Sequence, residues 1–103
     1  KWKAYTIPDA PKPQAPTKAG TPSFGPSGAP VWGSPTYDAK RGRVYFGSGE
    51  NYSSPADGNS DALIAVDART GQRVWQRQLT AKDAWNVGCM VGNDNCPVED
   101  GPD

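Results

Sequence analysis

The most informative stretch of this sequence reads Ala65-Val66-Asp67-Ala68-Arg69-Thr70-Gly71-Gln72-Arg73-Val74-Trp75. Its centre predicts a tight turn, because the Asp67 side chain can accept backbone hydrogen bonds and Gly71 can adopt a positive φ angle. Segments with strand-like composition lie on either side of this turn, at residues 61–66 and 73–79. The stretch therefore predicts two antiparallel strands joined by a turn.

Two further strands are expected on the N-terminal side of this hairpin, at residues 31–37 and 43–48. Residues 61–66 are apolar on both faces, which indicates a central strand, whereas residues 73–79 are polar enough for an outer strand. Short strands joined by turns rather than helices predict a four-stranded antiparallel meander over residues 31–79. A lone sheet of this kind exposes both faces, and the radial repetition of such sheets in a β-propeller covers them.

The other parts of the chain are expected to form linkers and loops. Residues 1–8 alternate loosely and predict a single strand, which we assign to the end of a preceding blade. Residues 9–30 are rich in Pro and Gly without a periodic apolar face, which predicts an irregular linker. Residues 80–103 predict an inter-blade loop that begins with one helical turn, because Thr80 and Asp83 have the spacing of a helix-start capping pair.

The composition narrows the class of protein. Only 35% of the 103 residues are hydrophobic, whereas 12 are Gly and 11 are Pro. Such a chain buries little core for its length, so we expect it to complete its core against another part of a larger protein. The 11 basic and 11 acidic residues balance and form no run of like charge, which argues against nucleic-acid binding. The longest apolar run, residues 62–66, is much shorter than the ~20 residues of a membrane span.

Cysteine and histidine usage constrains the chemistry. The absence of His excludes His-based zinc sites, Ser-His-Asp catalysis and a c-type haem within this chain. Cys89 and Cys96 are too far apart for a CxxC motif, which leaves a disulfide or two buried thiols. We expect the disulfide, because their loop has few apolar neighbours apart from Met90 and Val91. A disulfide indicates an oxidising compartment.

Residues 65–75 match the pattern A-x-D-x-x-T-G-x-x-x-W at every defined position. This pattern resembles the tryptophan-docking motif of quinoprotein β-propellers. The resemblance implies that Asp67, Thr70 and Gly71 build the turn, while Trp75 stacks on a peptide plane of a neighbouring blade. The motif alone would equally fit a non-catalytic propeller scaffold or binding module.

Neighbouring segments make the resemblance more specific. Those similar to the cofactor blade of quinoprotein alcohol dehydrogenases are residues 32–38, 43–52, 60–62 and 83–86. Those most similar to the polyvinyl alcohol dehydrogenases within that family are residues 5–6, 25–29, 83–86, 95–97 and 101–103.

The resemblance carries expectations for the whole protein. It implies an all-β fold, with this chain as a four-stranded antiparallel blade of an eight-bladed β-propeller with long Pro- and Gly-rich loops. It further implies a fragment of a periplasmic dehydrogenase that binds pyrroloquinoline quinone (PQQ) and Ca²⁺ and oxidises small or polymeric secondary alcohols such as polyvinyl alcohol. The other blades and a cytochrome c haem that accepts electrons would lie outside this chain.

The resemblance also assigns residues to the cofactors. Trp32 is similar in position to the tryptophan on which the quinone ring lies, and a flat, rigid indole suits that role. The loop at residues 47–51 resembles one that supplies a Ca²⁺ ligand, which falls on Glu50 or, with one insertion, on Asn51. Carboxylate and amide oxygens are ligands that Ca²⁺ prefers. The alternatives are a core tryptophan and a plain Gly-rich turn.

The sequence departs from the family at the catalytic base. Alcohol dehydrogenases of this class place an Asp directly after the Trp that corresponds to Trp85, and here that residue is Asn86. A neutral amide cannot act as a general base. Three alternatives stay open: Asp83 takes the role, the base lies outside this chain, or the blade is not catalytic.

Overall fold

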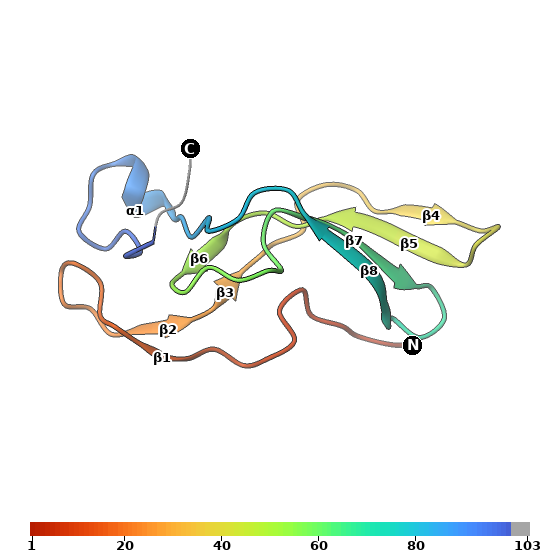
Figure 1. Ribbon diagram of the computed structural model, residues 1–103, viewed down its shortest axis with the longest axis horizontal. Helices are drawn as coiled ribbons and strands as arrows, with labels where there is room; N and C mark the ends of the chain where they lie inside the picture. The colour runs from red at the N-terminus through yellow and green to blue at the C-terminus, as the bar shows by residue number, and fades with distance from the viewer. Residues whose placement is uncertain (100–103) are drawn as a thin grey trace.

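The computed structural model describes residues 1–99. Figure 1 shows an elongated molecule, with a four-stranded sheet at one end and a hairpin and a helical loop at the other. The elements in chain order are β1 (Lys12–Gln14), β2 (Ser23–Gly25), β3 (Ser27–Gly28), β4 (Thr36–Asp38), β5 (Arg43–Gly47), β6 (Asn51–Ser53), β7 (Ala62–Asp67), β8 (Arg73–Gln78) and α1 (Val87–Met90).

The main sheet has the strand order β4-β5-β7-β8, with every neighbouring pair antiparallel. This confirms the predicted all-β blade, with β7 inside the sheet and β8 at its edge. Strand β4 is shorter than the predicted 31–37, because Pro35 lacks the N–H that a strand residue donates and the strand begins only after it.

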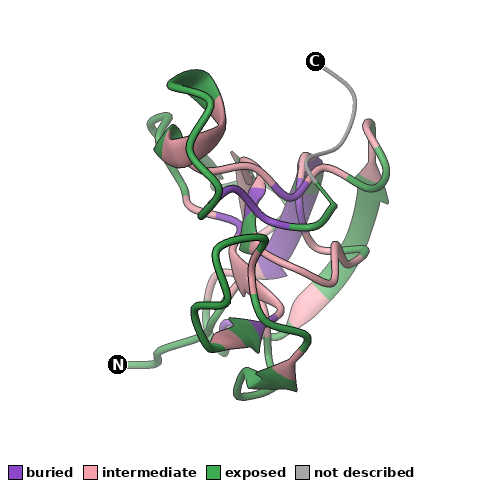
Figure 2. Cartoon of the chain, turned by 90° about the vertical axis from the view of Figure 1, so that its left-hand side faces the viewer, coloured by how far each residue is buried: buried purple, intermediate pink, exposed green. Residues whose placement is uncertain are grey.

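The core of the sheet lies on one face. Ala62, Ile64 and Val66 alternate along β7 and are buried, and Val44 and Phe46 of β5 pack against them. Figure 2 shows how small the buried part of the molecule is. The opposite face carries Tyr45 and Trp75, whose ring centroids are 6.1 Å apart, and it stays largely open.

The turn between β7 and β8 is held by its own side chains. The Asp67 carboxylate accepts hydrogen bonds from the backbone N–H groups of Arg69 (2.8 Å) and Thr70 (3.0 Å). These two bonds, the Arg69 one first, lower the pKa of Asp67. The Thr70 hydroxyl accepts a hydrogen bond from the Gln72 N–H at 3.2 Å, and Gly71 has a φ angle of +74°. Each motif residue of the turn therefore has a local structural task.

Residues 1–8 do not form the predicted strand; they cross the buried face of the sheet in extended, irregular form. The indole N–H of Trp2 donates a 2.9 Å hydrogen bond to the Ala68 carbonyl. Its ring covers Gly71 so closely that a Cβ there would lie 2.3 Å from a Trp2 ring carbon. A strand requires a partner strand, and here the Arg73 guanidinium binds the carbonyls of Tyr5 and Thr6 instead.

Residues 9–30 were predicted to be irregular, and this was wrong in part. β1 and β2 form a short antiparallel hairpin, and β3 pairs with β6. Pro13 sits inside β1, which is possible because β1 is an edge strand whose other side needs no N–H donor. These short pairings could not be predicted from the sequence, because the many Pro residues in this segment are typical of loops rather than strands.

The helical turn predicted to begin at Thr80 does not form there. Residues 83–85 instead run parallel to β6: Asn51 donates its N–H to the Asp83 carbonyl at 3.0 Å, and Trp85 donates to the Asn51 carbonyl at 2.7 Å. The helix α1 starts after Asn86. The predicted disulfide between Cys89 and Cys96 is formed.

The structure describes only part of the predicted inter-blade loop, and it bears on membrane spans only within the described residues. Of the inter-blade loop at residues 80–103, the last part, including the resemblance at 101–103, lies outside the described residues. Within residues 1–99, no helix is long and apolar enough to cross a membrane.

Candidate functional site

Strand β6 organises the end of the molecule beyond the main sheet. It pairs with β3 on one side and with residues 83–85 on the other. The residues just before β6 are hydrogen-bonded to residues 29 and 30. The Ala29 N–H donates to the Glu50 carbonyl at 2.7 Å, and the Gly49 N–H donates to the Pro30 carbonyl at 2.8 Å. These bonds hold the segment that leads to Trp32 beside Glu50.

An open pocket of about 390 Å³ results from this arrangement. It is lined by Trp32, Glu50, Tyr52, Trp85, Asn86 and Val87. The volume falls in the range of small-molecule sites, ~300–1,000 Å³. The structure thus brings together three residues singled out from the sequence, Trp32, Glu50 and Asn86.

Trp32 offers a free aromatic surface, since 80% of the residue is exposed. Such an indole can stack on a planar aromatic ligand, and the pocket adds two more aromatic side chains, Tyr52 and Trp85. Sequence reasoning gave no role to these two. An aromatic residue in an otherwise polar loop was the available signal for Trp85. For Tyr52, the available signal was its position directly after the two candidate metal ligands, Glu50 and Asn51.

The two candidate metal ligands differ in where they lie. Asn51 is fully buried, and its amide donates to the Ser27 carbonyl at 3.1 Å and to Asp57 at 3.2 Å. Its carbonyl oxygen accepts from the Asp57 N–H at 2.8 Å. Asn51 therefore stabilises the fold by linking β6 to residues 27 and 57, whereas Glu50 lines the pocket beside Trp32.

Asp83 does not line the pocket with Trp32. Its charge instead acts on Asp61, which has the unusual φ angle of +47° and a buried carboxylate oxygen without a hydrogen-bond partner in the described residues. Burial raises the pKa of Asp61, and the negative charges of Asp83 and Glu50 raise it further. Asp83 and Glu50 thus both lie close enough to Asp61 for their negative charges to repel its carboxylate.

Within residues 1–99, no three His, Cys, Asp or Glu side chains are placed to hold a metal ion on their own. Glu50 can provide one carboxylate ligand from this chain. A Ca²⁺ ion takes six to eight oxygen ligands, so a complete coordination shell would need ligands from elsewhere.

Asn86 has its side chain engaged by the backbone around it. Its carbonyl oxygen accepts from the Gly88 N–H at 2.9 Å and so caps α1. Its amide group contacts the carbonyls of Tyr52 and Asn95, each at 3.4 Å. The residue contributes to the pocket wall and offers no proton acceptor for a reaction.

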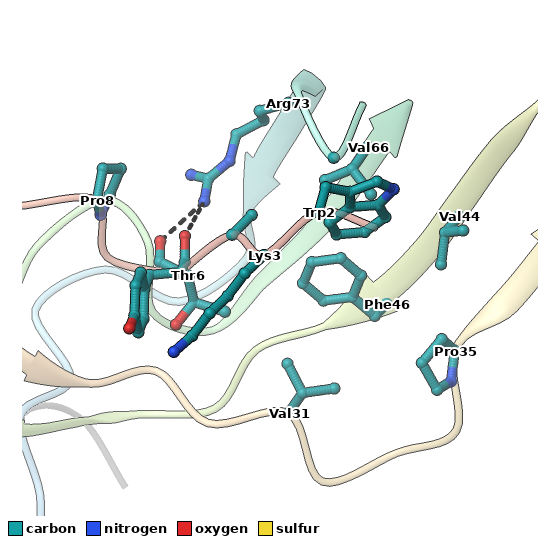
Figure 3. A pocket seen from close by; sticks show the side chains of 13 residues that line it. Trp2, Lys3, Thr6, Pro8, Val31, Pro35, Val44, Phe46, Val66 and Arg73 are labelled. Atoms are coloured by element: carbon teal, nitrogen blue, oxygen red, sulfur yellow. Dashed lines mark hydrogen bonds between the residues drawn. The ribbon is translucent and has the colours of Figure 1, made fainter. Parts of the chain in front are cut away.

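A larger hollow lies between residues 1–8 and the main sheet (Figure 3). Its volume is about 560 Å³. Its floor is apolar, formed by Val44, Phe46 and Val66 beneath Trp2. No carboxylate of the described residues lines this hollow, whereas Glu50 lines the smaller pocket, so we take the smaller pocket as the candidate site.

Comparisons with known proteins give a consistent result. The family model described as PQQ, glucose/ethanol/alcohol dehydrogenase, beta-propeller domain, matches residues 1–91. The chain is 38% identical over 102 residues to a polyvinylalcohol dehydrogenase of Pseudomonas sp. It is 41% identical over 105 residues to that of Sphingopyxis sp. (strain 113P3). Each match covers 99% of this chain.

A third relative is the quinohemoprotein alcohol dehydrogenase of Pseudomonas putida, 32% identical over 104 residues that cover 82% of this chain and 14% of the relative. The chain spans 16% of the length of the two polyvinylalcohol dehydrogenases. No solved structure matches the chain significantly.

Proposed function

The chain belongs to the PQQ β-propeller family of glucose, ethanol and alcohol dehydrogenases, and from that premise we propose that it supplies a cofactor-holding blade to a dehydrogenase of secondary alcohols. The observation that carries the proposal is the exposed indole of Trp32 in a pocket with Glu50 and Trp85. Polyvinyl alcohol, a polymeric secondary alcohol, is the proposed substrate, because two relatives are named for it.

The pocket residues suit PQQ. The Trp32 indole would form the surface on which the planar quinone lies, and Trp85 and Val87 would limit access of water from the side. PQQ, when bound, accepts the hydride equivalent of the alcohol, while the protein supplies binding and orientation.

Calcium is proposed as the second cofactor, with Glu50 as its ligand in this chain. The proposal is supported by the Glu50 carboxylate at the pocket wall and by the repulsion that Asp83 and Glu50 exert on Asp61. A cation there would offset that repulsion, and Ca²⁺ would polarise a quinone carbonyl as a Lewis acid. Asn51 is left out of the ligand set because its amide is already engaged.

The catalytic base and the electron acceptor are proposed to lie outside this chain. Asn86 has no basic group, and Asp83 is not part of the pocket lining. The chain has no His for a c-type haem, so a cytochrome c is proposed as the acceptor. A periplasmic location is proposed because disulfides such as Cys89–Cys96 persist in oxidising compartments.

The test is calorimetric titration of the full-length protein with PQQ in the presence of Ca²⁺. Trp32→Ala should weaken quinone binding by about tenfold, which corresponds to ~1.4 kcal/mol, within the range of one aromatic stacking contact. Tyr37→Ala removes another exposed aromatic residue, outside the pocket, and should leave the affinity unchanged.

Equal quinone binding by the native protein and Trp32→Ala would remove Trp32 from the site and favour a non-catalytic propeller scaffold. The 103-residue chain alone should bind PQQ weakly and catalyse nothing, because it provides one wall of the site and one carboxylate ligand. Dye-linked alcohol oxidation by the isolated chain would contradict this.

A further inference from the structure

Asn86 stands where three backbone segments meet. Its carbonyl oxygen accepts from the Gly88 N–H at 2.9 Å, which begins α1. Its amide nitrogen lies 3.4 Å from the carbonyl of Tyr52 on β6 and 3.4 Å from the carbonyl of Asn95. One carboxamide thus connects the pocket strand, the helix start and the residue before Cys96.

The segment beyond Asn86 is a closed loop. The disulfide joins Cys89 to Cys96, and the Asn93 N–H donates to the Gly88 carbonyl at 2.8 Å across the loop. The side chain of Asn95 accepts from the Thr21 hydroxyl at 2.8 Å, which ties the loop to the β1–β2 hairpin. Residues 86–96, which we call the disulfide loop, therefore form a small cross-linked unit.

This unit forms one side of the pocket. Trp85 and Asn86 precede α1, and Val87, its first residue, is 68% exposed at the pocket wall. Trp85 is held to β6 by its own N–H, which donates to the Asn51 carbonyl, so movement of the disulfide loop away from β6 would carry Val87 away from Trp32. The link between Asn86 and the Tyr52 carbonyl opposes that movement.

We propose that Asn86 is a positioning residue, whose carboxamide holds the disulfide loop against β6 and so sets the width of the quinone pocket. The proposal rests on the proposed function. An amide both accepts and donates hydrogen bonds, whereas a carboxylate only accepts them and would meet the carbonyls of Tyr52 and Asn95 without a proton to share.

The test uses Asn86→Asp and Asn86→Ser in the full-length protein. Both keep an acceptor that can cap α1, and both lose the amide donor. The matched control is Asn93→Asp, which introduces the same charge in the same loop but keeps the acceptor that binds the Asn95 N–H at 2.8 Å.

Both Asn86 variants should raise the dissociation constant for PQQ by about tenfold, which corresponds to ~1.4 kcal/mol of binding free energy. Their melting temperatures should stay near that of Asn93→Asp, whose affinity should equal that of the native protein. Asn86→Ser can also be combined with removal of the disulfide by Cys89→Ser and Cys96→Ser. This combined variant should lose no more PQQ affinity than the more damaging of the two changes alone, because both changes act on one loop.

Native affinity in Asn86→Asp, or the same loss in Asn93→Asp, would overturn the proposal. So would faster alcohol oxidation by Asn86→Asp at unchanged quinone affinity, which would make this position a base. If the native protein binds no PQQ, the proposed function fails, and hydrogen exchange still decides the role of Asn86. Amides at residues 88–96 should exchange faster in both Asn86 variants and not in Asn93→Asp, and equal exchange would refute the link.

Discussion

The two ends of the main sheet are built from the same strands, but one end is covered by other residues of this chain and the other is left exposed. At one end, the turn at residues 67–71 is satisfied by hydrogen bonds from its own backbone and covered by Trp2. At the other end, beyond β5 and the start of β7, Trp32 stands 80% exposed beside Glu50. Substitutions at the turn should therefore change stability, whereas substitutions at the pocket should change ligand binding.

The largest effect is expected at Gly71. Gly71→Ala places a methyl group at a φ angle of +74° and against the Trp2 ring. We expect a loss of about 3 kcal/mol in the free energy of unfolding, the sum of left-handed strain and overpacking. Gly42→Ala is the control, because Gly42 has a φ angle of +62° but nothing within 4 Å of the added Cβ, so only about 1 kcal/mol should be lost.

In a Trp2→Ala background, the effect of Gly71→Ala should fall to that of Gly42→Ala in urea unfolding. An equal loss at Gly71 and Gly42 in the native background would mean that Trp2 contributes no constraint on the turn.

The second prediction compares Trp2, which lies over the buried face of the sheet, with Trp75 of β8. Trp2 contacts the turn and donates a hydrogen bond, whereas Trp75 meets Tyr45 at the open face. In the isolated chain Trp2→Ala should therefore reduce the free energy of unfolding by about 2 kcal/mol and Trp75→Ala by about 1 kcal/mol or less. In a complete ring Trp75→Ala should cost about 3–5 kcal/mol, as for a buried Trp. A ring as tolerant of Trp75→Ala as the isolated chain would take Trp75 out of blade docking.

The third prediction concerns how the stability of the chain depends on Asp67 at low pH. Because the folded-state pKa of Asp67 lies below its ordinary value of 3.8, its ionised form stabilises the fold fully above that value. This contribution should be lost as the pH falls below about 4 and through the folded-state pKa. Asp67→Asn should remove this part of the acid dependence, which thermal melts between pH 2 and 7 would measure. Parallel acid curves for the variant and the native chain would contradict the assignment.

The smallest effect is expected at Asp61, near the pocket. Its raised pKa means that ionisation opposes folding, so its contribution to stability falls as the pH rises from 3.8 through the folded-state pKa. Asp61→Asn should therefore stabilise the chain at pH 7 by a few tenths of a kcal/mol, since the residue is only partly buried. The gain should vanish near pH 3, and a gain that persists there would point to backbone preference at the positive φ angle instead.

Patterns that act locally could be predicted from the sequence. The turn at Asp67 and Gly71 and the four strands around it follow from residues close in the chain, and so does the disulfide between neighbouring cysteines. Pairings across long distances could not be predicted. Residues 83–85 align with β6 through backbone groups that carry no side-chain signature, and this pairing replaced the expected helical turn.

The candidate site shows the same limit. Trp32 and Glu50 were identified by resemblance, but only the three-dimensional contacts separate Glu50, at the pocket, from Asn51, whose amide is buried in hydrogen bonds. Likewise, Asn86 was expected from the resemblance at the position of a base, and only the structure shows that its side-chain oxygen caps α1.

Trp2 and Trp75 also bear on how copies of this chain would associate. In one head-to-tail arrangement the indole of one unit would contact the turn of the next, and such heterologous contacts form fibres when they do not close into a ring. Here the turn at residues 67–71 is already occupied by Trp2 of the same chain. A second copy could therefore present its Trp75 but would find no free turn to receive it. While Trp2 stays in place, this one kind of contact, an indole against a free turn, is closed to a second copy.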